Sequence, residues 1–147
     1  MYLWTFGQNT YGQLGLGNTT NRSSPSQLGV ISTWNATSGG DGQTISTRSD
    51  NTIWSWGRND YGQLGLSNTT NYSSPKQIGA LTNWLTVSSG QYHNSAIKTD
   101  GTLWTWGYNA YGQLGIGNTV NQSSPAQVGA LTTWSQVSAG AAFTLGF

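Results

Sequence analysis

The amino-acid sequence predicts an all-β fold built from three copies of one unit. Tryptophan recurs at a spacing of fifty residues in two series: Trp4, Trp54 and Trp104, and Trp34, Trp84 and Trp134. Glycine occupies 21 of the 147 positions, which favours frequent turns over long helices. Aromatic residues form 12% of the chain and supply the large apolar side chains that a folded core needs.

The three copies align without a gap. They contain the segments WTFGQNTYGQLGLGN, WSWGRNDYGQLGLSN and WTWGYNAYGQLGIGN. A fixed period of about fifty residues is typical of stacked structural repeats. We therefore assign one repeat domain over 1–147, with repeats at 1–33, 34–83 and 84–133, and expect 134–147 to complete a unit with an N-terminal segment.

Strand patterns are clearest in the middle copy. Residues 84–89 (WLTVSS) alternate in polarity, and residues 93–98 (HNSAIK) form the next strand after the break at Gly90. Asp100-Gly101 predicts a type I′ hairpin turn, which needs positive φ at both central residues. The third strand, 102–106 (TLWTW), places Trp104 and Trp106 on one face.

The fourth strand follows a glycine-rich loop over 107–118. Ser124-Pro125 opens a short strand through Val128, and we expect this strand at a sheet edge because proline cannot donate to a ladder. Four strands in each repeat predict a β-propeller with four-stranded blades.

The same residues resemble a known family. The run from DGTLWTWGYNAYGQLGIGN to SSPAQVG, with the preceding SSGQYHNSAIKTDG, is similar to the repeat of the regulator of chromosome condensation propellers, in three copies over the whole chain. The resemblance implies the propeller fold. It does not extend to the nucleotide-exchange activity of the family's best-known member, because that protein has seven blades and this chain lacks its basic tail and inserted loops. The family's strand-entry histidine is present only as His93, with Gln43 and Phe143 at the equivalent positions.

Three blades are too few for a ring, since propellers usually have about four to eight. Residues 143–147 match a second strand and residues 2–6 match a third, so we expect the two ends of the chain to share one blade between copies. Two chains then give six blades, the preferred assembly, and three chains give nine; a fragment of a longer propeller is the alternative. The residues expected in this closure are Tyr2, Leu3, Trp4, Thr5, Phe6, Phe143, Thr144, Leu145 and Phe147.

Catalysis is not expected. The acid/base inventory consists of Asp41, Asp50, Asp60, Asp100 and His93. Asp50 and Asp100 occupy equivalent hairpin turns, and Asp60 is replaced in the other copies. Cysteine is absent and no nucleotide, zinc or calcium motif is present, so we predict no cofactor and no metal.

The long loops hold the better ligand candidates, because loops carry function more often than scaffold strands do. These candidates are Asn9, Tyr11, Asn59, Tyr61, Asn109 and Tyr111. The alternative is that the loop residues brace a turn. The paired tryptophans of the strands are expected to pack between blades rather than to stack on sugars.

Charge and composition narrow the partners. Charged residues form only 6% of the chain and the net charge is +1, with the five basic residues scattered singly, so nucleic acid is not an expected partner. No stretch is apolar enough to span a membrane, and no signal peptide is visible. We expect a structural or protein-interaction module that forms homo-oligomers, with a multivalent glycan-binding propeller as the alternative. The polar, weakly charged repeats are similar to those of bacterial surface and phage virion proteins, which favours an extracellular or virion-associated setting.

One loop position differs between the copies. Ser67 stands where the other two have Gly17 and Gly117. If this position has positive φ, we expect Ser67 to be strained by about 1 kcal/mol.

Overall fold

The structure, a computed structural model, describes residues 1–147 and contains twelve strands and no helix. The first six are β1 (Trp4–Gly7), β2 (Arg22–Gln27), β3 (Trp34–Gly39), β4 (Gln43–Arg48), β5 (Ile53–Gly57) and β6 (Tyr72–Gln77). The others are β7 (Trp84–Ser89), β8 (His93–Lys98), β9 (Leu103–Gly107), β10 (Gln122–Gln127), β11 (Val137–Ala139) and β12 (Thr144–Gly146).

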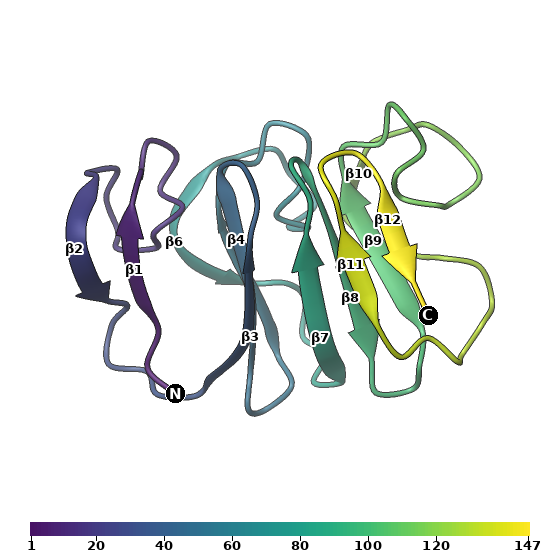
Figure 1. Cartoon of the computed structure of the whole chain (residues 1–147), viewed down its shortest axis with the longest axis horizontal. Coiled ribbons are helices and arrows are strands. Elements are labelled where there is room, and N and C mark those ends of the chain that lie inside the picture. Colours follow the sequence, from purple (N-terminus) through teal and green to yellow (C-terminus); the bar gives the residue numbers. More distant parts are fainter.

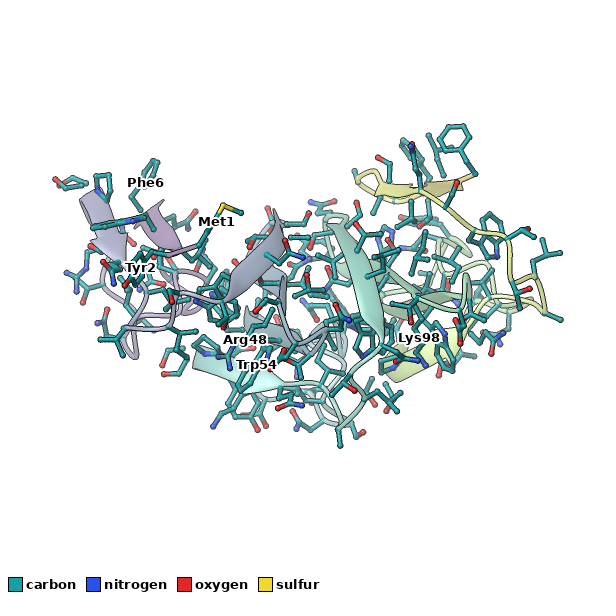
Figure 2. All side chains as sticks on the ribbon, turned by 90° about the horizontal axis from the view of Figure 1, so that it is seen from below. Met1, Tyr2, Phe6, Arg48, Trp54 and Lys98 are labelled. Atoms are coloured by element: carbon teal, nitrogen blue, oxygen red, sulfur yellow. The ribbon has the colours of Figure 1, made fainter.

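The strands form two complete blades and two half blades. Each complete blade has four antiparallel strands in chain order, β3-β4-β5-β6 and β7-β8-β9-β10, while β1-β2 and β11-β12 are isolated pairs. The sheets follow one another from the N-terminal to the C-terminal pair (Figure 1), and from below they form an open crescent with a pair at each tip (Figure 2). The predicted all-β fold with four-stranded blades is confirmed.

The hairpin turns are not of the predicted type. Gly101 has a φ of 75°, but Asp100 does not have positive φ, so the type I′ assignment is wrong. The Gly101 N–H donates to the Lys98 carbonyl and the Lys98 N–H donates to the Thr102 carbonyl, both at 3.0 Å. This is a three-residue loop, a type I turn closed by a left-handed residue. The sequence signal for a turn was correct, but the loop has one residue more than assumed.

The fourth strand lies at the blade edge, as its proline predicted. β10 pairs only with β9, and it begins at Gln122, two residues before the predicted start. A register shift between Gln122 and Ala126 accommodates Pro125. The strand's pairing extends to Val128, whose N–H donates to the Leu103 carbonyl.

The core lies between blades rather than within one sheet. β8 is buried at every residue because blades cover both of its faces. Trp106 is fully buried and packs in a cluster with Ile53, Ile78 and Trp84. Trp56 is equally buried and packs against Leu28 and Trp34. These contacts explain how a chain poor in aliphatic residues is stabilised, because each buried indole contributes a large apolar area.

Candidate functional site

The N-terminal half blade exposes an aromatic edge. β1 corresponds to β5 and β9, but it pairs only with β2, whereas β5 and β9 pair on both sides. Trp4 and Phe6 are 53% and 62% exposed, although Trp56 and Trp106, at the position of Phe6, are fully buried. Tyr2 is also exposed. β1 is also shorter than the expected 2–6, since nothing pairs with its free side.

The C-terminal half blade exposes the complementary edge. β12 corresponds to β4 and β8, but it pairs only with β11. Phe143 and Phe147 are 55% and 74% exposed, and Leu145 is also exposed. The equivalent strand β8 is entirely buried. β12 spans three residues rather than the expected five because it has no third strand beside it.

Three of the expected closure residues have side chains that make contacts within the chain. Leu3 packs against the cluster of Trp56. The Thr5 hydroxyl donates to the Leu14 carbonyl, and the Thr144 hydroxyl donates to the Gln113 carbonyl, each at 2.9 Å. Leu3 and Thr144 hold their half blades to the neighbouring complete blade, whereas Thr5 ties β1 to the loop that follows it in the same half blade.

A pocket marks the place of one missing aromatic side chain. In the complete copy, Trp106 is bordered by Ile53, Ile78 and Trp84, and its Nε1 donates to the Gln63 carbonyl at 2.9 Å. Fifty residues later, the equivalent residues line a pocket of about 280 Å³ that contains no aromatic side chain in the position of Trp106; they are Leu103, Gln113, Val128 and Trp134. Phe143 and Thr144 complete its wall. The pocket therefore has the outline of a tryptophan site.

Backbone hydrogen bonds between neighbouring blades are likewise missing at the C-terminal end of the chain. The Gly17 N–H donates to the Ser73 carbonyl, and the Ser67 N–H donates to the Ser123 carbonyl, both at 2.8 Å. The third equivalent, Gly117, has no acceptor within the chain. A Cβ at Gly12 would collide with the backbone of Ser73, whereas a Cβ at the equivalent Gly112 would meet no atom of another segment within 4 Å.

The loop asparagines brace the loops. Asn9, Asn59 and Asn109 are fully buried. The Asn59 side-chain nitrogen donates to the carbonyls of Asn68 and Thr70, and its oxygen accepts from the Leu64 N–H. The other two copies repeat these bonds. The polar atoms of these asparagines are therefore occupied inside the loop, the arrangement expected if the loop residues brace a turn.

The loop tyrosines gather with other aromatic residues at the same end of the blades. The ring of Tyr61 lies 4.7 Å from that of Tyr108 and 5.5 Å from that of Tyr92, between centroids. Tyr111 is largely exposed, 6.2 Å from Tyr108. Tyr11 lies on the other side of Arg58, whose guanidinium carbon is 5.1 Å from the centroid of the Tyr92 ring.

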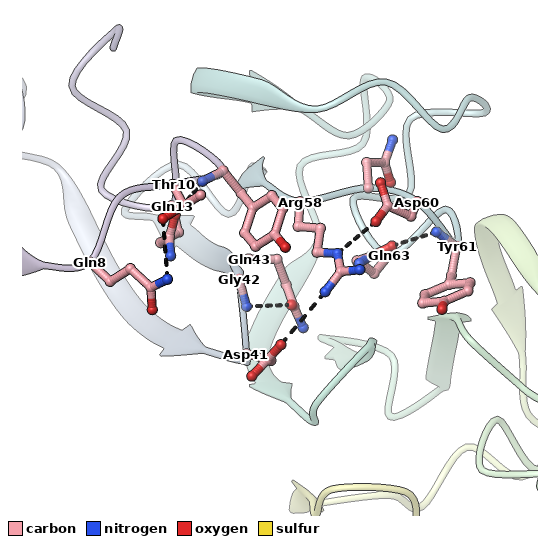
Figure 3. A network of polar contacts seen from close by, with 12 residues as sticks. Gln8, Thr10, Gln13, Asp41, Gly42, Gln43, Arg58, Asp60, Tyr61 and Gln63 are labelled. Atoms are coloured by element: carbon pink, nitrogen blue, oxygen red, sulfur yellow. Dashed lines mark hydrogen bonds and ion pairs between the residues drawn. The ribbon is translucent and has the colours of Figure 1, made fainter. Parts of the chain in front are cut away.

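Arg58 connects two of these loops with the turn between β3 and β4. Its Nε donates to an Asp60 carboxylate oxygen at 2.6 Å, and its Nη1 lies 3.7 Å from an Asp41 oxygen (Figure 3). The guanidinium carbon is 4.7 Å from the centroid of the Tyr11 ring. The hydrogen bond that Arg58 donates to the Asp60 carboxylate raises the pKa of Arg58. Sequence analysis missed these ion pairs because Arg58 and Asp60 are not repeated in the other copies, and Asp41 lies in a different turn of the chain.

His93 is a packing residue between two blades. It is fully buried, and its Nε2 lies 2.9 Å from the Thr144 hydroxyl. Burial lowers its pKa from 6.5 to about 4, so the ring is neutral at pH 7. No group of three or more histidine, cysteine or acidic side chains is close enough to hold a metal ion. The structure also has no helix that could cross a membrane.

The repeat sequence decides the family. The profile of the regulator of chromosome condensation (RCC1) repeat matches residues 2–46, 50–97 and 100–146, and a second RCC1 repeat profile matches 85–113. The chain belongs to the RCC1-repeat family. RCC1-type propellers are a protein-interaction fold. A comparison with curated protein sequences found no match to this RCC1-repeat chain.

Solved structures agree on the fold of this RCC1-repeat chain. It is similar to Prp20p from Saccharomyces cerevisiae, a structure described together with binding to Gsp1p and histones, with a TM-score of 0.87, 18% identity and coverage of 99% of this chain and 39% of that one. It is also similar to yeast RCC1 (Prp20) bound to Kap60, with a TM-score of 0.88, 18% identity and coverage of 99% of this chain and 37% of that one. For human WBSCR16 the TM-score is 0.55 and the identity 18%, and the match covers 99% of this chain and 52% of that one. The RCC1-repeat chain thus spans about two fifths of the yeast propellers.

Proposed function

We propose that this chain is a non-catalytic propeller module that assembles head to tail with copies of itself. The observation that supports the proposal is the aromatic-sized pocket at one tip of the crescent together with an unburied aromatic strand at the other. By the fifty-residue step that relates Trp56 to Trp106, the side chain due in that pocket is Phe6 of a second copy. Unlike Trp106, a phenylalanine has no side-chain N–H to donate to the carbonyl of the facing glutamine. The Gln113 carbonyl does not need this donor, because it already accepts a hydrogen bond from the Thr144 hydroxyl.

The strand pairing of the shared blade follows from the complete one. His93 lies opposite Gly107, and Ile97 lies opposite Leu103. The same register across copies places Phe143 opposite Gly7 and Phe147 opposite Leu3 of the second copy. Two chains then form a six-bladed ring, within the usual range for propellers. The interface is heterologous, so closure depends on the angle between blades.

Native mass spectrometry tests the assembly. We expect a species of twice the 15.7 kDa chain mass. Cysteines placed at Phe147 and Leu3 should form an interchain disulfide, whereas cysteines at Phe147 and exposed Val30 should not. A folded, monodisperse monomer would overturn the proposal. A mass of three chains would keep head-to-tail pairing and replace the six-bladed ring by a nine-bladed one.

Glycan binding is the second candidate, supported by the tyrosine cluster at the loop end. Aromatic rings that are at least partly exposed can stack on the apolar faces of sugars, and a ring of weak sites gains avidity. A glycan array probed with the intact chain tests this candidate. For the setting, the weakly charged, Asn-, Thr-, Ser- and Gly-rich composition supports a bacterial surface or phage virion protein, by analogy of composition.

A further inference from the structure

Two equivalent positions hold a cation against a pair of tryptophans. The guanidinium carbon of Arg48 lies 3.6 Å from the ring centroid of Trp54 and 4.5 Å from that of Trp34. Fifty residues later, the Lys98 ammonium lies 3.7 Å from Trp104 and 4.8 Å from Trp84. The positive charge is kept between the copies although the residue changes.

Each cation borders a groove between neighbouring blades. The groove at Arg48 has a volume of about 560 Å³, and its apolar wall includes Leu16, Leu28 and Ile31. The groove at Lys98 has about 240 Å³ and includes Ile78 and Leu81. Figure 2 shows Arg48 and Trp54 close together in one complete blade and Lys98 in the other.

Neither Arg48 nor Lys98 forms a salt bridge. Both ion pairs in the structure belong to Arg58, and the Nε of Arg48 is buried without a hydrogen-bond partner. Asp50 lies near enough to Arg48 to favour its charged form, but the Asp50 Oδ1 accepts hydrogen bonds from the N–H and hydroxyl of Thr52. Asp100 is held in the same way beside Lys98.

The remaining polar side chains of the grooves are largely satisfied. The Gln27 amide donates to the Gly29 carbonyl at 2.8 Å, and the hydroxyls of Ser67 and Ser124 bond to each other at 2.9 Å. A sugar would bring several hydroxyls that need partners. The grooves instead suit a ligand with one anionic group on an otherwise apolar stem.

We propose that these two grooves bind carboxylate side chains from an acidic, partly apolar peptide segment of a partner protein. A carboxylate pairs well with an arginine guanidinium, and the walls accept its methylene groups. The inference rests on the interaction role proposed above and names the partner class. It does not require ring closure, because both grooves lie within one chain.

The test uses a fluorescein-labelled peptide of four Gly-Glu-Leu repeats and its matched Gly-Gln-Leu peptide. We expect saturable binding of the glutamate peptide, weakened by salt, and little binding of the glutamine peptide. Equal binding of the two peptides, or none of either, would overturn the proposal. An oligomer of glucuronic acid that binds in place of the glutamate peptide would overturn the choice of a peptide.

Charge variants locate the site. Arg48→Gln and Lys98→Gln should each weaken binding about tenfold, the loss expected for a charge-assisted hydrogen bond, and the double variant should abolish it. Arg48→Lys should retain most of the affinity. Arg22→Gln removes the same charge outside both grooves and serves as the control; an equal loss there would overturn the assignment. If Arg48→Gln fails to fold, Lys98→Gln decides. Native mass spectrometry on the same samples measures head-to-tail assembly independently of peptide binding. A failure of the peptide-binding proposal can therefore be told apart from a failure of the assembly proposal.

Discussion

The indole Nε1 of Trp106 donates a hydrogen bond of 2.9 Å to the carbonyl oxygen of Gln63, across the boundary between two blades. Trp56 makes the same bond of 2.9 Å to Gln13. Each blade is therefore attached to its neighbour by one buried indole that contributes both apolar area and a satisfied donor. Stability consequently depends on contacts between repeats more than on any single sheet.

Trp106→Ala should destabilise the fold by about 3–5 kcal/mol, the usual cost of removing a fully buried large aromatic side chain. Trp104→Ala is the matched control, because Trp104 lies two residues earlier on the same strand but is only partly buried. It should cost about half as much. Urea denaturation at one protein concentration measures both, and equal losses would contradict the burial difference.

Removal of residues 143–147 should prevent assembly, because it deletes β12 and part of the pocket wall. Size-exclusion chromatography and native mass spectrometry report the result. Phe6→Ser, at the opposite tip, should cause the same loss of assembly while both complete blades remain folded. If the truncated chain forms an assembly with the same number of chains as the parent and has the same melting temperature, closure between copies is ruled out.

Ser67→Gly should stabilise the chain slightly, by up to about 1 kcal/mol. Ser67 has a φ of 60°, where its counterparts Gly17 and Gly117 have 76° and 79°, so the condition set from the sequence is met. The substitution gives up the exposed bond to Ser124. Ser67→Ala loses that bond and keeps the strain, so it should be less stable than the parent. A clear loss of stability in Ser67→Gly would show that the bond outweighs the strain.

Stability should fall as the pH drops from about 6.5 to about 4, because burial lowers the pKa of His93 from 6.5 to about 4. The unfolded chain binds a proton in this window and the folded chain does not, so the slope of stability against pH is positive there and the loss reaches ~3 kcal/mol at most. His93 is the only histidine. His93→Gln, which copies Gln43, should flatten the profile in denaturation experiments. A parent profile that is already flat would contradict the assignment.

The triple variant Tyr11→Ala, Tyr61→Ala, Tyr111→Ala should keep the fold. The tyrosine backbone N–H groups, not their rings, bond to the amide oxygens of Gln13, Gln63 and Gln113, at 2.9, 2.9 and 3.0 Å, and alanine retains these bonds. Loss of binding to a glycan from the array, at an unchanged melting temperature, would place the lectin role first. Failure to fold would show that the tyrosines are structural.

The sequence by itself determined the repeat, the order of strands and the family. The fifty-residue tryptophan spacing and the glycine-rich loops are local or periodic signals, and Pro125 excludes an internal strand for a steric reason that needs no partner. The hairpin at Asp100-Gly101 was located but mistyped, because loop length depends on the pairing register of the strands on either side.

Only the tertiary structure decided what the loop and strand residues do. Asn59 and Tyr61 are two residues apart in one loop, yet one is buried with its hydrogen bonds filled and the other reaches the tyrosine cluster. The pairing of Arg58 with Asp41, the unpaired charge of Arg48 and the vacant site beside Gly115 all arise between repeats. Packing across blades brings together residues that no spacing in one repeat relates, and this is why burial and charge pairing had to come from the structure.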